Sequence, residues 1–355
     1  MPRVRRGDVT WVEPRLVVEV EFSEWTHAGH VRQPSYKGLR DDRPAGAVRH
    51  ERAAAATVTS RGRELRLVNL DKVFWPDEQI TKGDLVDYYR QVASVLVPHL
   101  AGRPFTLRRY PDGAFGKAFF QKRAPAHMPA WIKTFRGVAA DRSGRERELD
   151  YPLVDDELAL LWMVNMGCID MNPWYSRVDR PDRPDFVLFD LDPTPEVPWT
   201  DVVAVARLLR GLLDGLGLES FPKTSGGKGF HVLVPLDRRS TYEDTRAFAE
   251  HVAGAIAGSY PALATTQWSK ARRRGVLIDA NQNGFGKTIA SVYSVRPKPG
   301  APVSTPLLWP EVGEGLDPHA FTMGAVLDRV ARHGDLYVGV LETRQSLSKA
   351  LKRLA

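Results

Sequence analysis

The segment FVLFDLDP, residues 186–193, decides the expected fold because a continuous apolar run leads directly into two acids. Four consecutive apolar residues are typical of a central strand that is covered on both faces. Side chains two positions apart on a strand project from the same face, so Asp190 and Asp192 converge while Leu191 points to the other side. Two such carboxylates can share hard divalent cations. Two solvated acids at the start of a loop are the alternative, because the pattern Asp-x-Asp alone is common.

The chain around this segment alternates between predicted strands and helices. Three more strands are predicted, with the sequences HVLVPL (231–236), VLID (276–279) and TIASVYSV (288–295). Apolar residues at helical spacing predict a helix over 202–216. Thr81 is a predicted N-cap, and Ser240 with Glu243 forms a capping-box pattern before a helix that extends to about residue 256. We therefore expect a mixed sheet with helices, of the α+β or α/β class.

A glycine-rich loop leads into one of these strands. Its sequence, KTSGGKGFH over residues 223–231, contains three glycines that allow the backbone to approach a phosphate closely. Ser225 offers a hydroxyl, Lys228 a positive charge and His231 a ring nitrogen. The loop lacks the Gly-Lys-Ser/Thr ending of a Walker A motif. A phosphate site is favoured over a flexible glycine hairpin with a packed histidine.

A third acid and a group of cations follow later in the chain. Asp279 ends the strand VLID, and Arg296 follows the strand TIASVYSV. A basic hairpin tip is predicted just upstream of Asp279, formed by Lys270, Arg272, Arg273 and Arg274. A basic cluster is often only a solvated face, but here it lies close in sequence to a carboxylate of the metal-binding type. If that carboxylate binds a metal, the phosphates of a nucleic-acid substrate would have to pass close to this basic cluster.

Composition narrows the class of protein. The 355 residues have a formal net charge of +7, which divides into +2 over residues 1–52, +8 over 61–145, −9 over 146–262 and +6 over 263–355, with no charge over 53–60. Basic segments on either side of an acidic centre suit a polyanionic partner. No apolar run approaches the roughly 18–20 residues that span a bilayer, and no signal-peptide pattern begins the chain. The single cysteine, Cys168, excludes an intrachain disulfide and a cysteine zinc cluster, which favours a reducing cytosol.

The order of these motifs resembles a known superfamily. Two acids, a Ser-Gly-x-x-Gly-x-His loop and a later acid resemble the archaeo-eukaryotic primases, and residues 61–355 resemble the polymerase domain of bacterial DNA ligase D. The segments that carry the resemblance are, in the order of that domain, RLVNLDKVFWPDEQITKGDLVDYY, RRYPDGAFGKAFFQKR, CIDMNPWYSRVDRPDRPDFVLFDLDP, KTSGGKGFHVLVPL and VLIDANQN. The resemblance implies an α+β, primase-like fold: a mixed β-sheet core flanked by helices, with a short β-rich N-terminal appendage.

The resemblance also implies roles for individual residues. The catalytic and metal-binding residues would be Asp190, Asp192 and Asp279, holding two divalent cations, Mn²⁺ or Mg²⁺. An incoming NTP or dNTP would contact Ser225, Lys228, His231, Arg296, Arg108, Gln282 and Asn172. Many relatives have histidine in place of Asn172, and an asparagine cannot be cationic, so we expect Asn172 to contact sugar or base.

The remaining implied residues concern DNA. A pocket for the 5′-phosphate of a gap or break end would consist of Asn69, Lys72 and Lys82, and a template-stacking pair of Phe119 and Phe120. Lys270, Arg272, Arg273 and Arg274 would belong to the loop that arranges the primer terminus or a second DNA end. An asparagine and two lysines suit a phosphate, and adjacent aromatic rings offer a stacking surface for bases. Core packing is the alternative for the two phenylalanines.

The implied function is template-directed nucleotidyl transfer in non-homologous end joining, filling short gaps and extending ends with a preference for ribonucleotides. The expected partners are DNA ends and gapped DNA with a 5′-phosphate, the Ku protein and a separate ATP-dependent DNA ligase. No membrane association is expected, the chain would be a monomer or a DNA-bridged dimer, and its location would be cytoplasmic, at the nucleoid.

The first 52 residues resemble a different protein. EVEF (19–22) and RQPSYKGLRDD (32–42) are similar to the C-terminal end of the OB domain of an ATP-dependent DNA ligase. About fifty residues cannot close a five-stranded barrel, and the chain contains no Lys-x-Asp-Gly adenylation motif, so we do not expect it to ligate DNA on its own. The segment is either a vestige or a piece that completes a separate ligase core. Residues 53–60, small and uncharged, are predicted to be a linker before the domain 61–355.

Two other classes of function compete with a polymerase. Asp190-Leu191-Asp192-Pro193-Thr194 fits the first motif of haloacid-dehalogenase-like phosphatases, with Asp190 as nucleophile, but these enzymes need a later acidic metal motif. The only late Gly-Asp pair, Gly334-Asp335, has no acid at the required spacing. A non-catalytic DNA-end binding module is the other alternative, which the intact set of three acids disfavours.

Overall fold

The computed structural model describes residues 16–21, 24–25, 31–32, 34–39, 55–140 and 145–354. The chain divides into two compact units, Met1–Ala53 and Ala54–Ala355. In the first unit, the described strands are β1 (Val18–Glu21) paired antiparallel with β4 (Ser35–Leu39), and β2 (Glu24–Trp25) paired with β3 (Val31–Arg32). The ligase-like residues 40–52 lie outside the described part of the chain.

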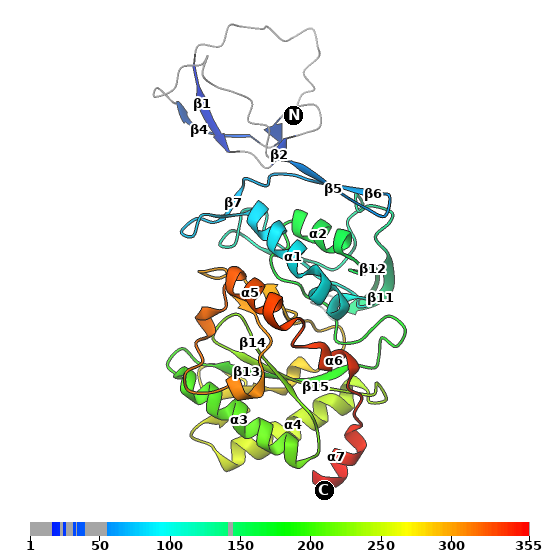
Figure 1. Ribbon diagram of the computed structural model, residues 1–355, viewed down its shortest axis with the longest axis vertical. Helices are drawn as coiled ribbons and strands as arrows, with labels where there is room; N and C mark the ends of the chain where they lie inside the picture. Colours follow the sequence, from blue (N-terminus) through cyan, green and yellow to red (C-terminus); the bar gives the residue numbers. More distant parts are fainter. Residues whose placement is uncertain are drawn as a thin grey trace. The chain divides into compact units, whose positions relative to one another are not determined.

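The second unit begins with short hairpins and two helices (Figure 1). Its antiparallel pairs are β5 (Ala56–Ser60) with β6 (Arg63–Leu67), β7 (Val73–Trp75) with β8 (Ile80–Thr81), β9 (Leu107–Arg109) with β10 (Phe119–Gln121), and β11 (Thr134–Ala140) with β12 (Glu146–Pro152). Helix α1 (Lys82–Leu100) packs against α2 (Glu157–Asn165). The predicted N-cap of α1 is confirmed, since the Thr81 side chain accepts a hydrogen bond from the Asp84 amide.

A five-stranded mixed sheet forms the centre of the unit, in the order β14-β15-β13-β17-β16. The strands are β13 (Phe186–Pro193), β14 (Phe221–Thr224), β15 (Phe230–Pro235), β16 (Ala264–Thr265) and β17 (Val276–Asp279), and only the β16–β17 pair is parallel. Figure 1 shows α3 (Trp199–Gly215) and α4 (Tyr242–Ser259) on one side of β13, β14 and β15. The predicted α+β class is therefore confirmed.

The alternation of side chains along β13 determines where the acids lie. Val187, Phe189 and Leu191 belong to the hydrophobic core that includes α3 and α4, whereas Phe186 and Leu188 belong to a second core with α1 and α2. Since the period of a strand is two residues, Asp190 and Asp192 share the face of Phe186 and Leu188. The predicted central strand, covered on both faces, carries its acids away from the two helices.

The chain ends in short strands and helices. These are β18 (Ser294–Val295) paired with β19 (Val303–Ser304), the 3₁₀ turns η3 (Ala280–Gln282), η4 (Trp309–Glu311) and η5 (Pro318–Ala320), and the helices α5 (Met323–His333), α6 (Val338–Glu342) and α7 (Leu347–Leu354). Among the described residues, no helix is both long and apolar enough to cross a bilayer.

Several local predictions were wrong. Most of the predicted linker 53–60 is strand β5, in which Val58 packs on the core, and the unit boundary follows Ala53. Helix α4 is capped one residue later than predicted, by Thr241 with Asp244. Of the predicted strand 288–295, only the last two residues form a strand.

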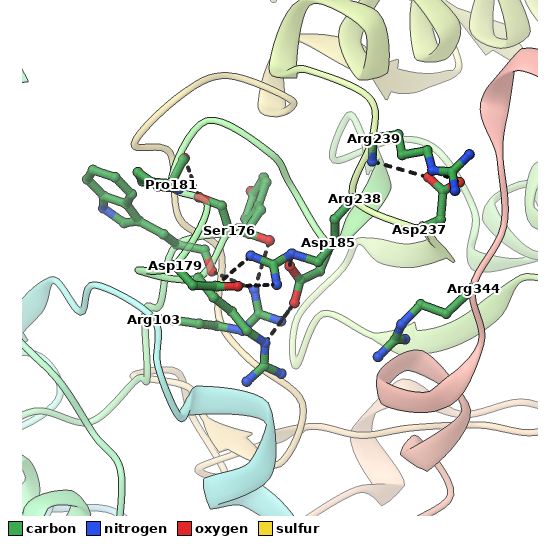
Figure 2. Close-up of polar contacts among 12 residues, drawn as sticks. Arg103, Ser176, Asp179, Pro181, Asp185, Asp237, Arg238, Arg239 and Arg344 are labelled. Carbon is green, nitrogen blue, oxygen red and sulfur yellow. Dashed lines mark hydrogen bonds and ion pairs between the residues drawn. The ribbon is translucent and has the colours of Figure 1, made fainter.

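A partly buried ion network holds the loop that enters β13 (Figure 2). Asp185 accepts hydrogen bonds from Arg103 at 2.5 Å and Arg177 at 2.9 Å, and Arg238 Nε lies 3.0 Å from its other oxygen. Arg103 also donates to the backbone oxygen of Tyr175 at 2.8 Å. The start of the acid-bearing strand is thereby fixed to residues from three separate parts of the sequence.

Candidate active site

Four polar side chains form one row across the central sheet. The strand registers pair Lys223 with His231, His231 with Asp190, and Asp190 with Asp279, across β14, β15, β13 and β17. Directly paired residues project from the same face, so the row runs from a lysine through an imidazole to two carboxylates. Lys223, His231 and Asp279 are 1%, 2% and 5% exposed. The row brings together residues that lie far apart in the sequence.

A cavity of about 350 Å³ adjoins this row. The predicted residues that line it are Asp190, Asp192, Ser225, Lys228, His231, Gln282 and Arg296, and Lys298, which was not predicted, joins them. Arg296 is anchored because its guanidinium donates to the Ser225 backbone oxygen at 3.0 Å. The cavity lining thus combines carboxylates with cations, as a ligand that carries phosphates and a divalent cation would require.

The glycines of the 223–231 loop permit this arrangement. Gly226 has a φ of +67°, and a Cβ atom there would lie 2.4 Å from Arg296 Cγ. A Cβ at Gly229 would lie 2.8 Å from the Leu191 backbone oxygen. Larger residues would therefore push the loop away from both β13 and Arg296, which supports the predicted close approach of the backbone.

Burial shifts the pKa values along the row. Lys223 Nζ lies 2.6 Å from His231 Nδ1, and His231 Nε2 lies 3.4 Å from Asp190 Oδ1. Burial lowers the pKa of both Lys223 and His231 well below their usual ranges. Desolvation raises the pKa of Asp190 to about 6, and desolvation together with the neighbouring Asp190 charge raises that of Asp279. Two adjacent carboxylates at elevated pKa form an electrostatically unfavourable pair that a cation would relieve.

The donor set fits a hard divalent cation through Asp190 and Asp279. Asp192 is engaged differently, because Arg273 donates to its Oδ2 at 2.8 Å. Within the described ranges, no group of three or more His, Cys, Asp or Glu side chains is arranged to hold a metal ion. The three predicted acids therefore lie on one sheet face, two as direct neighbours and the third held by an arginine.

The predicted basic hairpin tip is instead a loop between two parallel strands, β16 and β17. Lys270, Arg272 and Arg274 are exposed, whereas Arg273 is 4% exposed and also donates to the Trp268 backbone oxygen at 3.2 Å. Arg273 thus ties this loop to Asp192.

Arg108 and Asn172 lie outside the residues that line the cavity. Arg108 donates to the buried Asp170 at 3.2 Å, and its guanidinium carbon lies 5.3 Å from the centre of the Phe120 ring. The Asn172 amide donates to the Asp170 backbone oxygen at 3.0 Å, and Asn172 is 6% exposed. Both residues contact Asp170 and are engaged within the protein.

The two phenylalanines are on the surface. Phe119 and Phe120 belong to β10 and are 43% and 64% exposed, so core packing is excluded for them. Arg109 and Arg108 lie opposite them on β9, and each guanidinium carbon is 5.3 Å from the facing ring centre. Exposed aromatic rings backed by cations form a surface on which bases can stack.

The predicted phosphate-binding lysines differ in their surroundings. Lys72 is exposed and donates to the Pro111 backbone oxygen at 2.6 Å, and Asn69 is exposed with a φ of +56°. Lys82 is 4% exposed, and its Nζ donates to Val68 O, Asn165 O and Asn165 Oδ1 at 2.7–2.8 Å. Burial, followed by the charges of Lys72 and Arg109, lowers the pKa of Lys82 to about 8. Three cations therefore gather here, although Lys82 already has a protein partner for each N–H.

Three functional candidates were missed by the sequence analysis: Lys223, Lys298 and Arg109. Lys223 and Lys298 lie within quoted or adjoining segments, yet only the strand register and the cavity wall reveal their positions. Arg109 directly follows Arg108, and the family resemblance implied a role for Arg108 alone.

Comparisons with known proteins agree with this arrangement. Residues 81–337 match the family model of the LigD primase-polymerase domain. The chain belongs to the LigD primase-polymerase domain family. Residues 1–43 match the model of the ATP-dependent DNA ligase C-terminal region, so the resemblance drawn from the sequence is confirmed for both segments.

The relatives of this LigD-family chain are longer proteins. It is 32% identical over 368 residues to the multifunctional non-homologous end joining protein LigD of Pseudomonas aeruginosa, covering 99% of the chain and 43% of that relative. It is 36% identical over 281 residues to the Mycobacterium bovis protein of the same name, covering 76% of the chain and 36% of the relative. The chain therefore spans less than half the length of these curated relatives.

A solved structure is also similar. The polymerase domain from Mycobacterium tuberculosis ligase D, determined in complex with DNA, aligns with a TM-score of 0.73 and 34% identity. The alignment covers 79% of this chain and 99% of that domain.

The late Gly-Asp pair, Gly334-Asp335, which was considered for the phosphatase alternative, has another role. The Asp335 carboxylate contacts His99 Nε2 at 2.9 Å and accepts a hydrogen bond from the Tyr293 hydroxyl at 2.7 Å.

Proposed function

We propose that this chain catalyses template-directed nucleotidyl transfer, filling short gaps and extending DNA ends in non-homologous end joining. The observation that carries the proposal is the pair of Asp190 and Asp279 on neighbouring strands, together with a cavity lined by Asp190, Ser225, Lys228 and Arg296. Membership of the LigD family and the names of its relatives support the repair context.

The side chains of the cavity would have two different roles in such a reaction, binding metal ions and binding the triphosphate. Divalent cations, when bound, lower the pKa of an attacking hydroxyl and neutralise developing negative charge. Asp190, Asp192 and Asp279 would hold two of them, Mn²⁺ or Mg²⁺. Lys228 and Arg296 would bind triphosphate oxygens through charge-assisted hydrogen bonds, with the Ser225 hydroxyl as an additional donor. No protein nucleophile is required.

The DNA would be held outside the cavity. The exposed rings of Phe119 and Phe120 offer a stacking platform for the template. Lys72 and Arg109 would bind a terminal 5′-phosphate, with Asn69 beside them and the buried Lys82 contributing positive charge, and the Lys270–Arg274 region would face the primer or a second DNA end. Affinity should therefore fall with salt and depend on the terminal phosphate.

Substrate preference and partners complete the proposal. The nucleotide would be a ribonucleotide in preference to a deoxyribonucleotide, and Ku and a separate ATP-dependent ligase would act beside the chain. The 355 residues contain no Lys-x-Asp-Gly motif, so this segment should not seal nicks by itself. The protein would work at the nucleoid, as a monomer or as a DNA-bridged dimer.

Primer extension on gapped DNA is the direct test. The gap should carry a 5′-phosphate or, as a control, a 5′-hydroxyl, and NTPs and dNTPs should be supplied separately with Mn²⁺ or Mg²⁺. We expect templated incorporation that is abolished by Asp190→Ala with Asp192→Ala. Normal extension by that double variant would refute the catalytic assignment, whereas DNA binding without incorporation by the unmodified chain would favour the non-catalytic module.

A further inference from the structure

Trp268 is exposed on the loop that joins β16 to β17. Its side chain is 57% exposed, although tryptophan is a residue that proteins bury to a large extent on average. Among the described residues, no other aromatic ring and no guanidinium group packs on its indole. Phe285 is similarly exposed, at 51%, but its ring packs edge-on against Trp174. The Trp268 indole therefore offers a free aromatic surface on which a ligand can stack.

Hydrogen bonds order the backbone on both sides of Trp268. Before it, the Gln267 amide donates to Thr265 Oγ1 at 3.0 Å, and the Ser269 amide donates to Gln267 Oε1 at 3.1 Å. After it, the Arg273 amide donates to the Ser269 backbone oxygen at 2.9 Å. The ring is thus presented by a built turn, and a partner that stacks on it need not order this backbone first.

One buried side chain joins this turn to the active site. The Arg273 guanidinium donates to the Trp268 backbone oxygen at 3.2 Å and to Asp192 Oδ2 at 2.8 Å. Arg273 is 4% exposed, and Asp192 lines the candidate active-site cavity. The backbone of Trp268 is therefore one arginine side chain away from an acid of the cavity.

The charge around the ring indicates which class of partner fits it. Residues 261–275 contain no acid, and the exposed side chains that follow Trp268 include Lys270, Arg272 and Arg274. A stacking ring beside several cations suits a polyanion that itself carries flat rings, which describes a nucleic acid. Bases inside a duplex already stack on both faces, so the base that meets an indole is an unpaired one.

We propose that Trp268 stacks on an unpaired base at the 3′ end of the DNA strand to be extended, while the exposed cations of the same loop bind its phosphates. The placement at the 3′ end rests on the proposed function, because it follows from the tie between this loop and Asp192. Stacking on single-stranded DNA does not depend on that function. The surface is distinct from the pair Phe119 and Phe120, which belongs to β10.

Fluorescence anisotropy without metal or nucleotide tests the stacking. The probes are a labelled single-stranded oligonucleotide and the blunt duplex of the same sequence. We expect Trp268→Ala to raise the Kd for the single strand on the order of tenfold, the size of one lost base–aromatic stack, and to change the Kd for the duplex less than about twofold. An unchanged Kd for the single strand would refute the proposal and leave a protein as the partner of this ring.

Three further variants separate stacking from charge and from general loss of surface. Trp268→Phe keeps a ring and should retain most of the affinity. Tyr260→Ala is the matched control, because it removes a ring that is 45% exposed at the end of α4, and it should leave both Kd values unchanged. Lys270→Ala should weaken single strand and duplex by similar factors and reduce the salt slope by about 1. If Trp268→Ala also weakened both forms of DNA equally, stacking on an unpaired base would be excluded.

The fluorescent base 2-aminopurine, which is quenched when it stacks, tests the position. It is placed at either the 3′ or the 5′ terminus of the single strand. We expect stronger quenching at the 3′ terminus, and loss of this difference in Trp268→Ala; equal quenching at both termini of the strand bound to the unmodified chain would refute the placement. A chain that stacks DNA on Trp268 but incorporates no nucleotide would disprove the proposed function alone. An active chain whose Trp268→Ala variant binds single strands normally would disprove this inference alone.

Discussion

The Asp185 network offers a test of what holds the acid-bearing strand in place. The Asp185 carboxylate pairs with Arg103, Arg177 and Arg238, and the Arg103 side chain is only 3% exposed. Figure 2 shows Arg103 and Arg238 beside Asp185. Asp185→Asn keeps the volume but removes the charge, leaving the Arg103 guanidinium with neutral acceptors only, among them the Tyr175 backbone oxygen. Removing one partner of a buried ion pair costs about 3–5 kcal/mol. At roughly 2–4 °C per kcal/mol, the midpoint of thermal unfolding should fall on the order of 10 °C.

The matched control is Asp179→Asn. Asp179 binds the same Arg238 at 2.7 and 2.9 Å, but its side chain is 60% exposed, and such pairs contribute about 0–1 kcal/mol. Thermal unfolding followed by circular dichroism at low and high salt measures both variants. We expect the Asp185→Asn loss to be insensitive to salt, because the pair is buried. Equal midpoints for the two variants would refute the argument that burial makes Asp185 important.

Three other outcomes are expected. Phe120→Ala should weaken binding of a duplex with a single-stranded template overhang by about 1–3 kcal/mol in fluorescence anisotropy, and leave a blunt duplex unaffected; equal losses on both would exclude stacking. Lys72→Ala should reduce the preference for a 5′-phosphate over a 5′-hydroxyl gap on the order of tenfold in the same assay, since it removes a charged contact; an unchanged preference would remove Lys72 from the pocket. Burial lowers the pKa of His99, so below about pH 6.5 the unfolded chain gains a proton that the folded chain resists, and stability is lost on acidification. Between pH 7 and pH 5 the thermal midpoint of His99→Gln should fall less than that of the unmodified chain, and an equal fall would contradict this.

Local sequence was sufficient where a single segment determines its own structure. The apolar run of β13, the strands β15 and β17 and the N-cap of α1 were all predicted within a few residues. Prediction was poorer where two local patterns competed. Ser240 with Glu243 and Thr241 with Asp244 both satisfy the capping box, and only the hydrogen bonds of the folded helix distinguish them. Residues 288–293 have strand-like composition but lie beyond the two-residue pairing of β18 with β19.

The candidate site shows a deeper limit of prediction from sequence. Asp190 and Asp192 could be placed on one face because both lie on one strand, whereas the row through Lys223, His231 and Asp279 depends on three separate registers. A shift of one residue in any of these pairings would turn a side chain to the opposite face, toward α3 and α4. Nothing in the residues around Lys223 fixes that register; the packing of the whole sheet does. The lysine was therefore visible in the sequence, at the start of the glycine-rich segment, but its contact with His231 was not.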